Sequence, residues 1–175
     1  LLGEKLGHSF SPTIHKQLWD CDYDLMPTPK DQVDDLFRER NFSGINVTVP
    51  YKQTVIPFLD ELSPLAQKLG AVNTIIRRDG KLIGHNTDPF GFLTMLNSSG
   101  LEVSGKKVLV LGSGGASATA VYVLQEMGAE VIVISRSGDN NYSNLHLHSD
   151  ASLIVNATPV GMYPNNGQSP LDLSV

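Results

Sequence analysis

The clearest hydrophobic pattern of the chain lies between residues 108 and 135. Four apolar residues, Val108–Leu111, run without polar alternation into a cluster of glycines, which is typical of a strand buried on both faces of a parallel sheet. Apolar spacing over Ala116–Met127 predicts a helix, and Glu130–Ser135 predicts a second buried strand. The pattern therefore predicts a β-α-β unit.

A glycine-rich turn joins the first strand of this unit to its helix. Gly112 permits a sharp reversal, Gly114 lets the backbone approach a pyrophosphate, and the free N–H groups at the helix N-terminus bind the anion. In the pattern G-x-G-x-x-G the third glycine would fall at Ser117, so an ordinary glycine-rich turn is the alternative. The β-α-β context favours a dinucleotide site.

The residues that follow the second strand indicate which dinucleotide binds. An acidic side chain there would bind the ribose 2′-hydroxyl of NAD. This chain has Ser135, Arg136 and Ser137, a cation flanked by hydroxyls, which suits a 2′-phosphate. We therefore expect NADP, and a solvated loop arginine is the alternative for Arg136.

Near the N-terminus the pattern predicts a helix that begins with Pro12, is capped by Ser11 and buries Ile14 and Leu18. The hydroxyls of Ser9 and Ser11 would then lie at a helix N-terminus, where they can bind a substrate carboxylate. The helix dipole contributes only ~0.3–1 kcal/mol at exposed sites, so the hydroxyls would have to set the geometry. Plain capping is the alternative role of Ser11.

Alternation over residues 44–49 predicts a strand with one polar face. One face carries Ile45, Val47 and Val49, and the other carries Asn46 and Thr48. Lys52 follows just past the C-terminal end of this strand, which is where open α/β sheets bind ligands. The alternative is a surface edge strand with a lysine that reaches into solvent.

The dipeptide Asp79-Gly80 predicts a hairpin with a type I′ turn. With these two residues as the loop, Arg78 pairs with Lys81.

The register of this hairpin, continued outward from the turn, predicts that two asparagines distant in sequence lie opposite each other. Asn73 is expected to face Asn86, and Asp88 would share that face if the strand stays extended. The register therefore predicts a polar cluster of these three residues. Asp88 also precedes Pro89 and an apolar helical pattern, so a helix cap is its alternative role.

Composition limits the classes of function. The chain has 175 residues, a net charge of −5, one cysteine (Cys21) and no block of lysine or arginine. We therefore expect no internal disulfide, no metal site and no nucleic-acid partner. No apolar run approaches the ~20 residues that span a bilayer, so no membrane association is expected. A cytoplasmic enzyme, acting as a monomer or homodimer, fits these properties.

Six motifs in order along the chain resemble the shikimate dehydrogenase family. They are Leu6-x-His8-Ser9-x-Ser11-Pro12, Asn46-Val47-Thr48-Val49-Pro50-Tyr51-Lys52, Gly70-Ala71-Val72-Asn73-Thr74, Asn86-Thr87-Asp88-x-x-Gly91, Gly112-Ser113-Gly114-Gly115-Ala116-Ser117 and Asn156-Ala157-Thr158-Pro159-Val160-Gly161-Met162. Together they cover nearly all of the chain. The resemblance implies reversible, NADP-dependent reduction of 3-dehydroshikimate to shikimate, a step in the biosynthesis of chorismate and the aromatic amino acids.

The resemblance also implies roles for individual residues. Lys52 and Asp88 would be the catalytic pair. The substrate would be bound by Ser9, Ser11, Thr48 and Asn73, together with Asn86 from the polar cluster. The cofactor would be bound by Gly112, Gly114, Gly115 and Ala116 at the pyrophosphate, by Ser135, Arg136 and Ser137 at the 2′-phosphate, and by Thr158 and Met162 near the nicotinamide. The family's usual asparagine at position 135 is a serine here, which leaves the cation in place.

The protonation state of the lysine follows from general magnitudes. An ordinary lysine has a pKa of ~10.4 and each pKa unit corresponds to ~1.36 kcal/mol, so a neutral lysine at pH 7 costs about 4 kcal/mol. We therefore expect Lys52 to be the general acid in reduction, with Asp88 as the carboxylate that orients it. Oxidation of the alcohol should then improve as the pH rises.

The expected fold is α/β, with an N-terminal α/β substrate domain built on a mainly parallel sheet and a partial Rossmann-type dinucleotide-binding domain. The expected boundaries are 1–88 for the substrate domain, 89–100 for a connecting helix and 101–175 for the NADP-binding domain. Relative to the family, we expect the sequence to lack a few N-terminal residues and roughly a third of the protein at the C-terminal end. The polar connection of residues 138–150 is also shorter than the family's helical connection.

Two other functions remain open from the sequence. The first is a quinate/shikimate dehydrogenase paralogue with a broader substrate range and use of NAD. The second is a non-catalytic dinucleotide-binding or sensor module.

Overall fold

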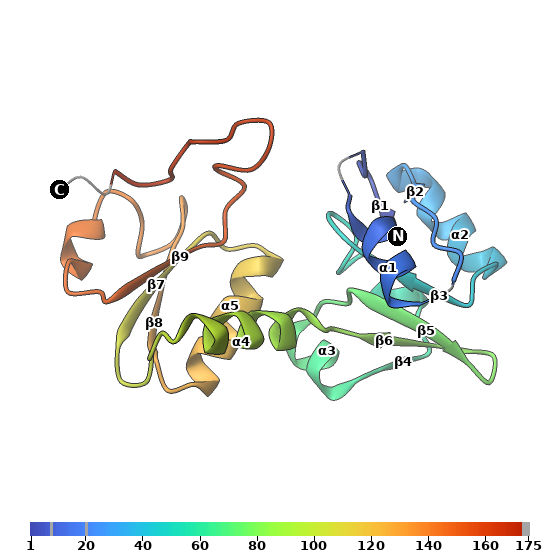
Figure 1. The fold of residues 1–175 in the computed structure, drawn as a ribbon, viewed down its shortest axis with the longest axis horizontal. Helices are drawn as coiled ribbons and strands as arrows, with labels where there is room; N and C mark the ends of the chain where they lie inside the picture. The colour runs from blue at the N-terminus through green and yellow to red at the C-terminus, as the bar shows by residue number, and fades with distance from the viewer. Residues whose placement is uncertain (8, 20, 173–175) are drawn as a thin grey trace. The chain divides into compact units, whose positions relative to one another are not determined.

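The fold is described from a computed structural model, which covers residues 1–7, 9–19 and 21–172. These residues form two compact units, Leu1–Thr87 and, from Asp88 onward, a C-terminal unit (Figure 1). His8 of the first motif lies outside the described residues. In the described part of the chain no helix has the length and apolar character needed to cross a membrane.

The described residues of the N-terminal unit form three α-helices and six short strands. The helices are α1 (Ser11–Leu18), α2 (Val33–Glu39) and α3 (Pro64–Leu69), and the 3-10 turns are η1 (Lys30–Gln32) and η2 (Ile56–Phe58). The strands are β1 (Leu2–Gly3), β2 (Met26–Pro27), β3 (Gly44–Asn46), β4 (Glu61–Leu62), β5 (Thr74–Arg78) and β6 (Lys81–His85).

The sheet of this unit is mixed. Its order is β3-β5-β6-β4, with antiparallel pairs β3–β5 and β5–β6 and a parallel pair β4–β6. Strands β1 and β2 pair in parallel, and a parallel bridge joins Leu2 to Val47 just after β3. Parallel pairing in this unit is therefore found between β4 and β6 and between β1 and β2, whereas β3 and the central hairpin pair antiparallel.

The predicted hairpin is confirmed. Asp79 and Gly80 both adopt positive φ angles, 52° and 79°, as a type I′ turn requires. Arg78 pairs with Lys81, and the ladder runs outward as far as the pair Thr74–His85.

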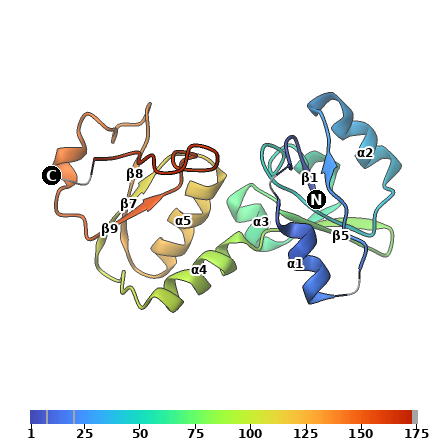
Figure 2. The same cartoon turned by 45° about the horizontal axis from the view of Figure 1, so that its top comes forward.

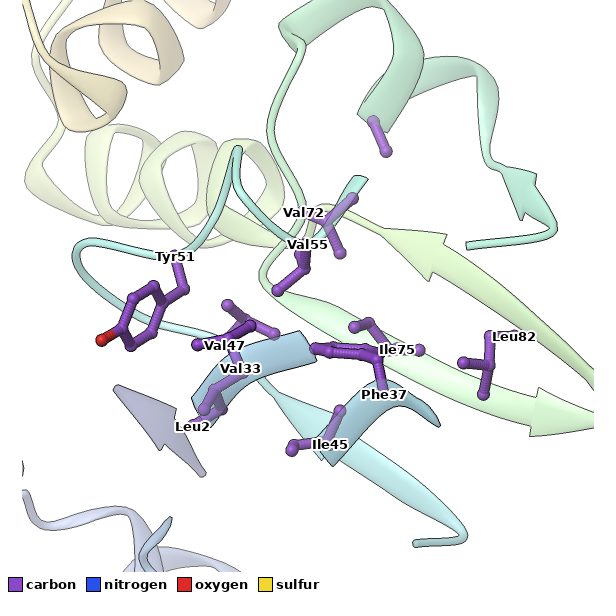
Figure 3. Close-up of a cluster of buried hydrophobic side chains, with 11 residues drawn as sticks. Leu2, Val33, Phe37, Ile45, Val47, Tyr51, Val55, Val72, Ile75 and Leu82 are labelled. Atoms are coloured by element: carbon purple, nitrogen blue, oxygen red, sulfur yellow. The ribbon is translucent and has the colours of Figure 1, made fainter. Parts of the chain in front are cut away.

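The core of the N-terminal unit is formed by side chains from α2, α3, β1, β3, β5 and β6 and from the segments between them (Figure 3). Ile45 and Val47 are buried as the alternation predicts, whereas Val49 is exposed. The prediction for Val49 is wrong because β3 ends at Asn46, and the period of two no longer applies once the chain turns at residues 49–55.

Helix α1 differs from its prediction in two ways. It begins at Ser11 rather than Pro12, so Phe10 occupies the cap position and Ser11 is the first helical residue. Ile14 and Leu18 are 52% and 61% exposed, and the helix has no buried residue. The spacing predicts which face of the helix is apolar, but it does not predict that another element covers that face.

As far as residue 172, the C-terminal unit is a three-stranded parallel sheet with two long helices. Its elements are α4 (Asp88–Ser99), β7 (Lys107–Leu111), α5 (Gly115–Glu126), β8 (Glu130–Ile134), η3 (Leu145–His148) and β9 (Leu153–Asn156). The sheet order is β8-β7-β9, and the two helices pack side by side on one face of it (Figures 1 and 2). The predicted β-α-β unit and the α/β class are confirmed.

Strand β7 is buried on both faces, as its unbroken apolar sequence predicts. Val108 and Val110 pack against α4 and α5, while Leu109 and Leu111 belong to a cluster on the opposite face. That opposite face is covered by Leu145 of η3, Ala151 just before β9, and Leu171.

Candidate functional site

The turn after β7 requires glycine at Gly112. Its φ is 107°, and a Cβ there would lie 2.9 Å from the carbonyl oxygen of Ala157. A Cβ at Gly114 or Gly115 would meet no atom within 4 Å. The protein itself therefore leaves open space beside these two glycines, at the N-terminal end of α5.

Ser117, which occupies the place of the third glycine in the dinucleotide fingerprint, is buried within α5. The third glycine of that fingerprint allows close packing between helix and strand. A serine is small enough to be enclosed at the same place.

A cavity of about 540 Å³ opens next to this turn, within the C-terminal unit. It is lined by Gly112, Ser113, Gly114, Ser135, Arg136, Tyr142, Ala157, Thr158, Pro159, Val160 and Pro170. Most of these residues follow the C-terminal ends of the three parallel strands β7, β8 and β9. Open α/β sheets bind their ligands at this end of the sheet.

Four residues expected at the cofactor do not line this cavity: Gly115, Ala116, Ser137 and Met162. Gly115 is the first residue of α5, and Met162 is 65% exposed. Ala116 instead borders an apolar groove between α4, α5 and β9.

Arg136 lines the cavity and is exposed. Within the part of the chain that the structure describes, its guanidinium has no hydrogen bond or ion pair with a protein group. Its loop is held by the bond from the Ser135 amide to the carbonyl oxygen of Asn140, at 3.1 Å. The cation is thus presented to the cavity and to solvent.

Asn156 at the end of β9 organises the third wall of the cavity. Its Oδ1 accepts from the amide and the hydroxyl of Thr158, at 2.9 and 2.7 Å. Its Nδ2 donates to the carbonyl oxygen of Val160 at 3.0 Å. Asn156 has no individual role among the sequence-based expectations, although an asparagine that ends an apolar strand shortly before Thr-Pro is a turn signal.

In the N-terminal unit, the two serines lie at the start of α1. The amide of Ser11 donates to the Oγ of Ser9 at 3.2 Å. Burial raises the pKa of the Tyr23 phenol, and a hydrogen bond with the Ser11 side chain acts in the opposite direction. Ser9 and Ser11 therefore form one small hydroxyl cluster next to Tyr23.

Asn73 is bonded to Thr87. Its Nδ2 donates to the Thr87 hydroxyl at 2.9 Å, and its Oδ1 accepts from the Thr87 amide at 3.0 Å. Asn86 is buried, and its Nδ2 donates to the carbonyl oxygen of Ala71 at 3.0 Å. The hairpin register is correct, but both asparagines lie beyond the last paired residues, where the ladder no longer fixes which side chains meet.

Backbone bonds connect the segments that carry Thr48, Lys52 and Asn73. The carbonyl oxygen of Lys52 accepts from the Val72 amide at 2.8 Å, and the carbonyl oxygen of Asn73 accepts from the Val47 amide at 2.8 Å. Lys52 and Thr48 are both half-buried. Asp88 is the first residue of α4 and begins the C-terminal unit.

Comparison with known proteins gives a consistent result. The family profile for the shikimate dehydrogenase substrate binding domain matches residues 1–75. A curated relative from Carboxydothermus hydrogenoformans, named shikimate dehydrogenase (NADP(+)), is 36% identical and aligns with 97% of this chain and 70% of its own length. That alignment runs over 201 residues, so the relative carries residues within the matched region that this chain lacks.

Solved structures agree with these sequence matches. Shikimate dehydrogenase 1 from Peptoclostridium difficile is 39% identical, with a TM-score of 0.90 over 97% of this chain and 70% of that one. The enzyme from Thermus thermophilus, solved with NADP(H) and shikimate, is 35% identical, with a TM-score of 0.86 over 97% of this chain and 71% of that one. The chain therefore belongs to the shikimate dehydrogenase family.

Proposed function

We propose that this protein catalyses the reversible, NADP-dependent reduction of 3-dehydroshikimate to shikimate. The main support for the proposal is the cavity at the C-terminal ends of β7, β8 and β9, which is lined by both the glycine turn and Arg136. The chain also belongs to the shikimate dehydrogenase family. Related proteins named shikimate dehydrogenase (NADP(+)), and one solved with NADP(H) and shikimate, support the same substrate and cofactor. We also propose a cytoplasmic location and a monomeric or homodimeric state.

The residues of the cavity fit NADP. The open space at Gly114 and Gly115 lets a pyrophosphate approach the N–H groups that begin α5. Arg136, with Ser135 beside it, supplies a charge and a hydroxyl for the 2′-phosphate. Thr158, held by Asn156, is our candidate for the nicotinamide end.

The N-terminal unit is proposed to bind the substrate. Ser9 and Ser11 would bind its carboxylate at the start of α1, and Thr48 and Asn73 would bind ring hydroxyls. Asn86 is the further substrate-binding residue that we propose; it is buried, and its Nδ2 donates to the carbonyl oxygen of Ala71.

The proposed chemistry requires one proton from the protein. When bound, NADPH supplies the hydride for the carbonyl carbon of 3-dehydroshikimate. The carbonyl oxygen then gains negative charge and takes a proton from the Nζ of Lys52, which gives the alcohol. Before the transfer, the Lys52 ammonium polarises the carbonyl, and Asp88 is the proposed carboxylate that orients this ammonium.

A matrix of initial rates tests the function. Shikimate and quinate are each offered with NADP⁺ and with NAD⁺, and NADPH binding is measured by fluorescence in parallel. The proposal predicts the largest kcat/KM for shikimate with NADP⁺. Dominant activity with quinate and NAD⁺ would instead identify a quinate/shikimate dehydrogenase, and NADPH binding without turnover of either acid would identify a binding module.

A further inference from the structure

Tyr23 is linked by hydrogen bonds and ring stacking to both groups that are proposed to bind the substrate, Ser11 and Asn73. We propose that Tyr23 is a positioning residue, whose phenol holds Ser11 on α1 in register with Asn73 next to β5. The inference rests on the proposed function, which assigns the substrate carboxylate to Ser11 and a ring hydroxyl to Asn73.

The connection to Asn73 runs through two intermediate side chains. The Tyr23 hydroxyl donates to Asn46 Oδ1 at 2.8 Å, although the two residues are 23 positions apart. Asn46 Nδ2 donates to the Thr74 hydroxyl at 3.2 Å, and this hydroxyl donates to Asn73 Oδ1 at 3.0 Å. The chain of bonds thus crosses from the polar face of β3 to the start of β5.

The same chain of bonds continues to the end of the N-terminal unit. Asn73 accepts from and donates to Thr87, the residue before Asp88. All of these bonds lie within residues 1–87, the N-terminal unit.

The connection to α1 is made through one face of the helix. The rings of His15 and Tyr23 stack with their centroids 4.0 Å apart and an interplanar angle of 17°. Ser11 and His15 are four residues apart, so they lie on the same face of α1, and both are half-buried. The Tyr23 ring therefore packs against the face of α1 that carries Ser11.

Helix α1 depends on this contact more than most helices would. None of its residues is buried, and its apolar residues Ile14 and Leu18 are exposed. In most proteins the burial of an apolar face fixes the position of a helix. Here Tyr23, through His15 and Ser11, fixes the end of α1 that is proposed to bind the carboxylate.

The variant Tyr23→Phe tests the proposal because it keeps the stacked ring and removes the hydroxyl. We expect the dissociation constant and the KM for shikimate to rise about threefold to tenfold, as for the loss of one hydrogen bond. The KM for NADP⁺ should change less than about twofold. Wild-type affinity for shikimate in Tyr23→Phe would overturn the proposal.

Tyr51→Phe is the matched control. Tyr51 is buried in the same unit, and its hydroxyl donates to the carbonyl oxygen of Thr28 at 2.7 Å. Loss of this hydroxyl in Tyr51→Phe should lower thermal stability at least as much as Tyr23→Phe does, but it should leave the KM for shikimate unchanged. Equal rises in KM for both variants would show a general effect on folding and contradict a positioning role.

A double-mutant cycle tests whether Tyr23 and Asn73 affect shikimate binding jointly or each independently of the other. Tyr23 and Asn73 are separated by Asn46 and Thr74, so independent effects on shikimate affinity would add. We expect the combined Tyr23→Phe and Asn73→Ala variant to bind shikimate more tightly than additivity predicts. Strict additivity would contradict the network.

The dissociation constant for shikimate, measured without NADP⁺, distinguishes a failure of this inference from a failure of the proposed function. A wild-type protein that binds shikimate without oxidising it would refute the proposed reaction, while the affinity difference of Tyr23→Phe would still support the positioning role. Normal turnover by the wild type with unaltered affinity in Tyr23→Phe would refute only the positioning role. A wild type that binds no shikimate would refute both.

Discussion

A Cβ on Gly112 would lie 2.9 Å from the carbonyl oxygen of Ala157, which couples the glycine turn after β7 to the loop after β9. The contact is to backbone, so a side-chain rotation cannot relieve it. The φ of 107° at Gly112 adds strain for any other residue. The close approach of these two loops forms one end of the proposed NADP cavity.

This relationship predicts that Gly112→Ala destabilises the protein. We expect a loss of about 1–3 kcal/mol in the free energy of unfolding, measured by urea denaturation, from backbone strain and the clash with Ala157. Gly114→Ala is the control, because its Cβ would meet no protein atom within 4 Å. This control should fold with near wild-type stability and yet raise the KM for NADP⁺, since the added methyl enters space assigned to the pyrophosphate. If the two variants are equally stable, the turn does not depend on Gly112.

Arg136 is predicted to select NADP over NAD. Replacement by alanine removes one charge-assisted interaction with the 2′-phosphate, so the KM for NADP⁺ should rise roughly 10- to 100-fold while that for shikimate stays constant. Arg38→Ala provides the comparison, because Arg38 is exposed on α2 and pairs with Asp35 in the N-terminal unit. Arg38→Ala should leave both KM values unchanged. If Arg136→Ala keeps its preference for NADP⁺, Arg136 is a solvated loop residue that does not select the cofactor.

Asp60 is predicted to make part of the stability depend on pH. The backbone N–H of Leu82 donates to its carboxylate at 2.8 Å and is the largest cause that lowers the pKa of this group below 3.8, with Arg40 contributing as well. A depressed pKa in the folded state stabilises the fold above pH 3.8, and this stabilisation is lost as the pH falls through the lower folded-state value. Asp60→Ala should therefore be less stable than wild type at pH 7, and the difference should shrink below pH 3.8.

Thermal unfolding at several pH values measures this effect. Asp35→Ala is the reference, since it removes a carboxylate from an exposed pair on α2, and exposed pairs of this kind contribute little to stability. A stability difference for Asp60→Ala that is the same at neutral pH and well below pH 3.8 would show that Asp60 acts by packing and not by its charge.

The sequence predicts the elements that follow simple periods. The unbroken run at Val108–Leu111 identifies the doubly buried strand β7, and Asp79-Gly80 sets the register of the β5–β6 hairpin. Both features depend on neighbours in sequence, so local rules are sufficient for them.

The features that the sequence does not predict depend on contacts between distant segments. Ile14 and Leu18 have the spacing of a buried face, but nothing in the sequence tells whether another element covers that face. Asn73 bonds Thr87 and Asn86 bonds the carbonyl oxygen of Ala71, and the register of the ladder does not specify either of these partners. Tyr23 is not identified by any local pattern, since its partner Asn46 lies 23 positions away.

The most direct test of the account is a single-turnover measurement of 3-dehydroshikimate reduction by bound NADPH, in the wild type and in Lys52→Ala. If Lys52 donates the proton to the carbonyl oxygen, the rate constant should fall about 10²- to 10⁴-fold in the variant. The dissociation constant of NADPH, measured on the same samples, should stay within about twofold. A Lys52→Ala protein that binds both ligands and reduces the substrate at the wild-type rate would contradict the account.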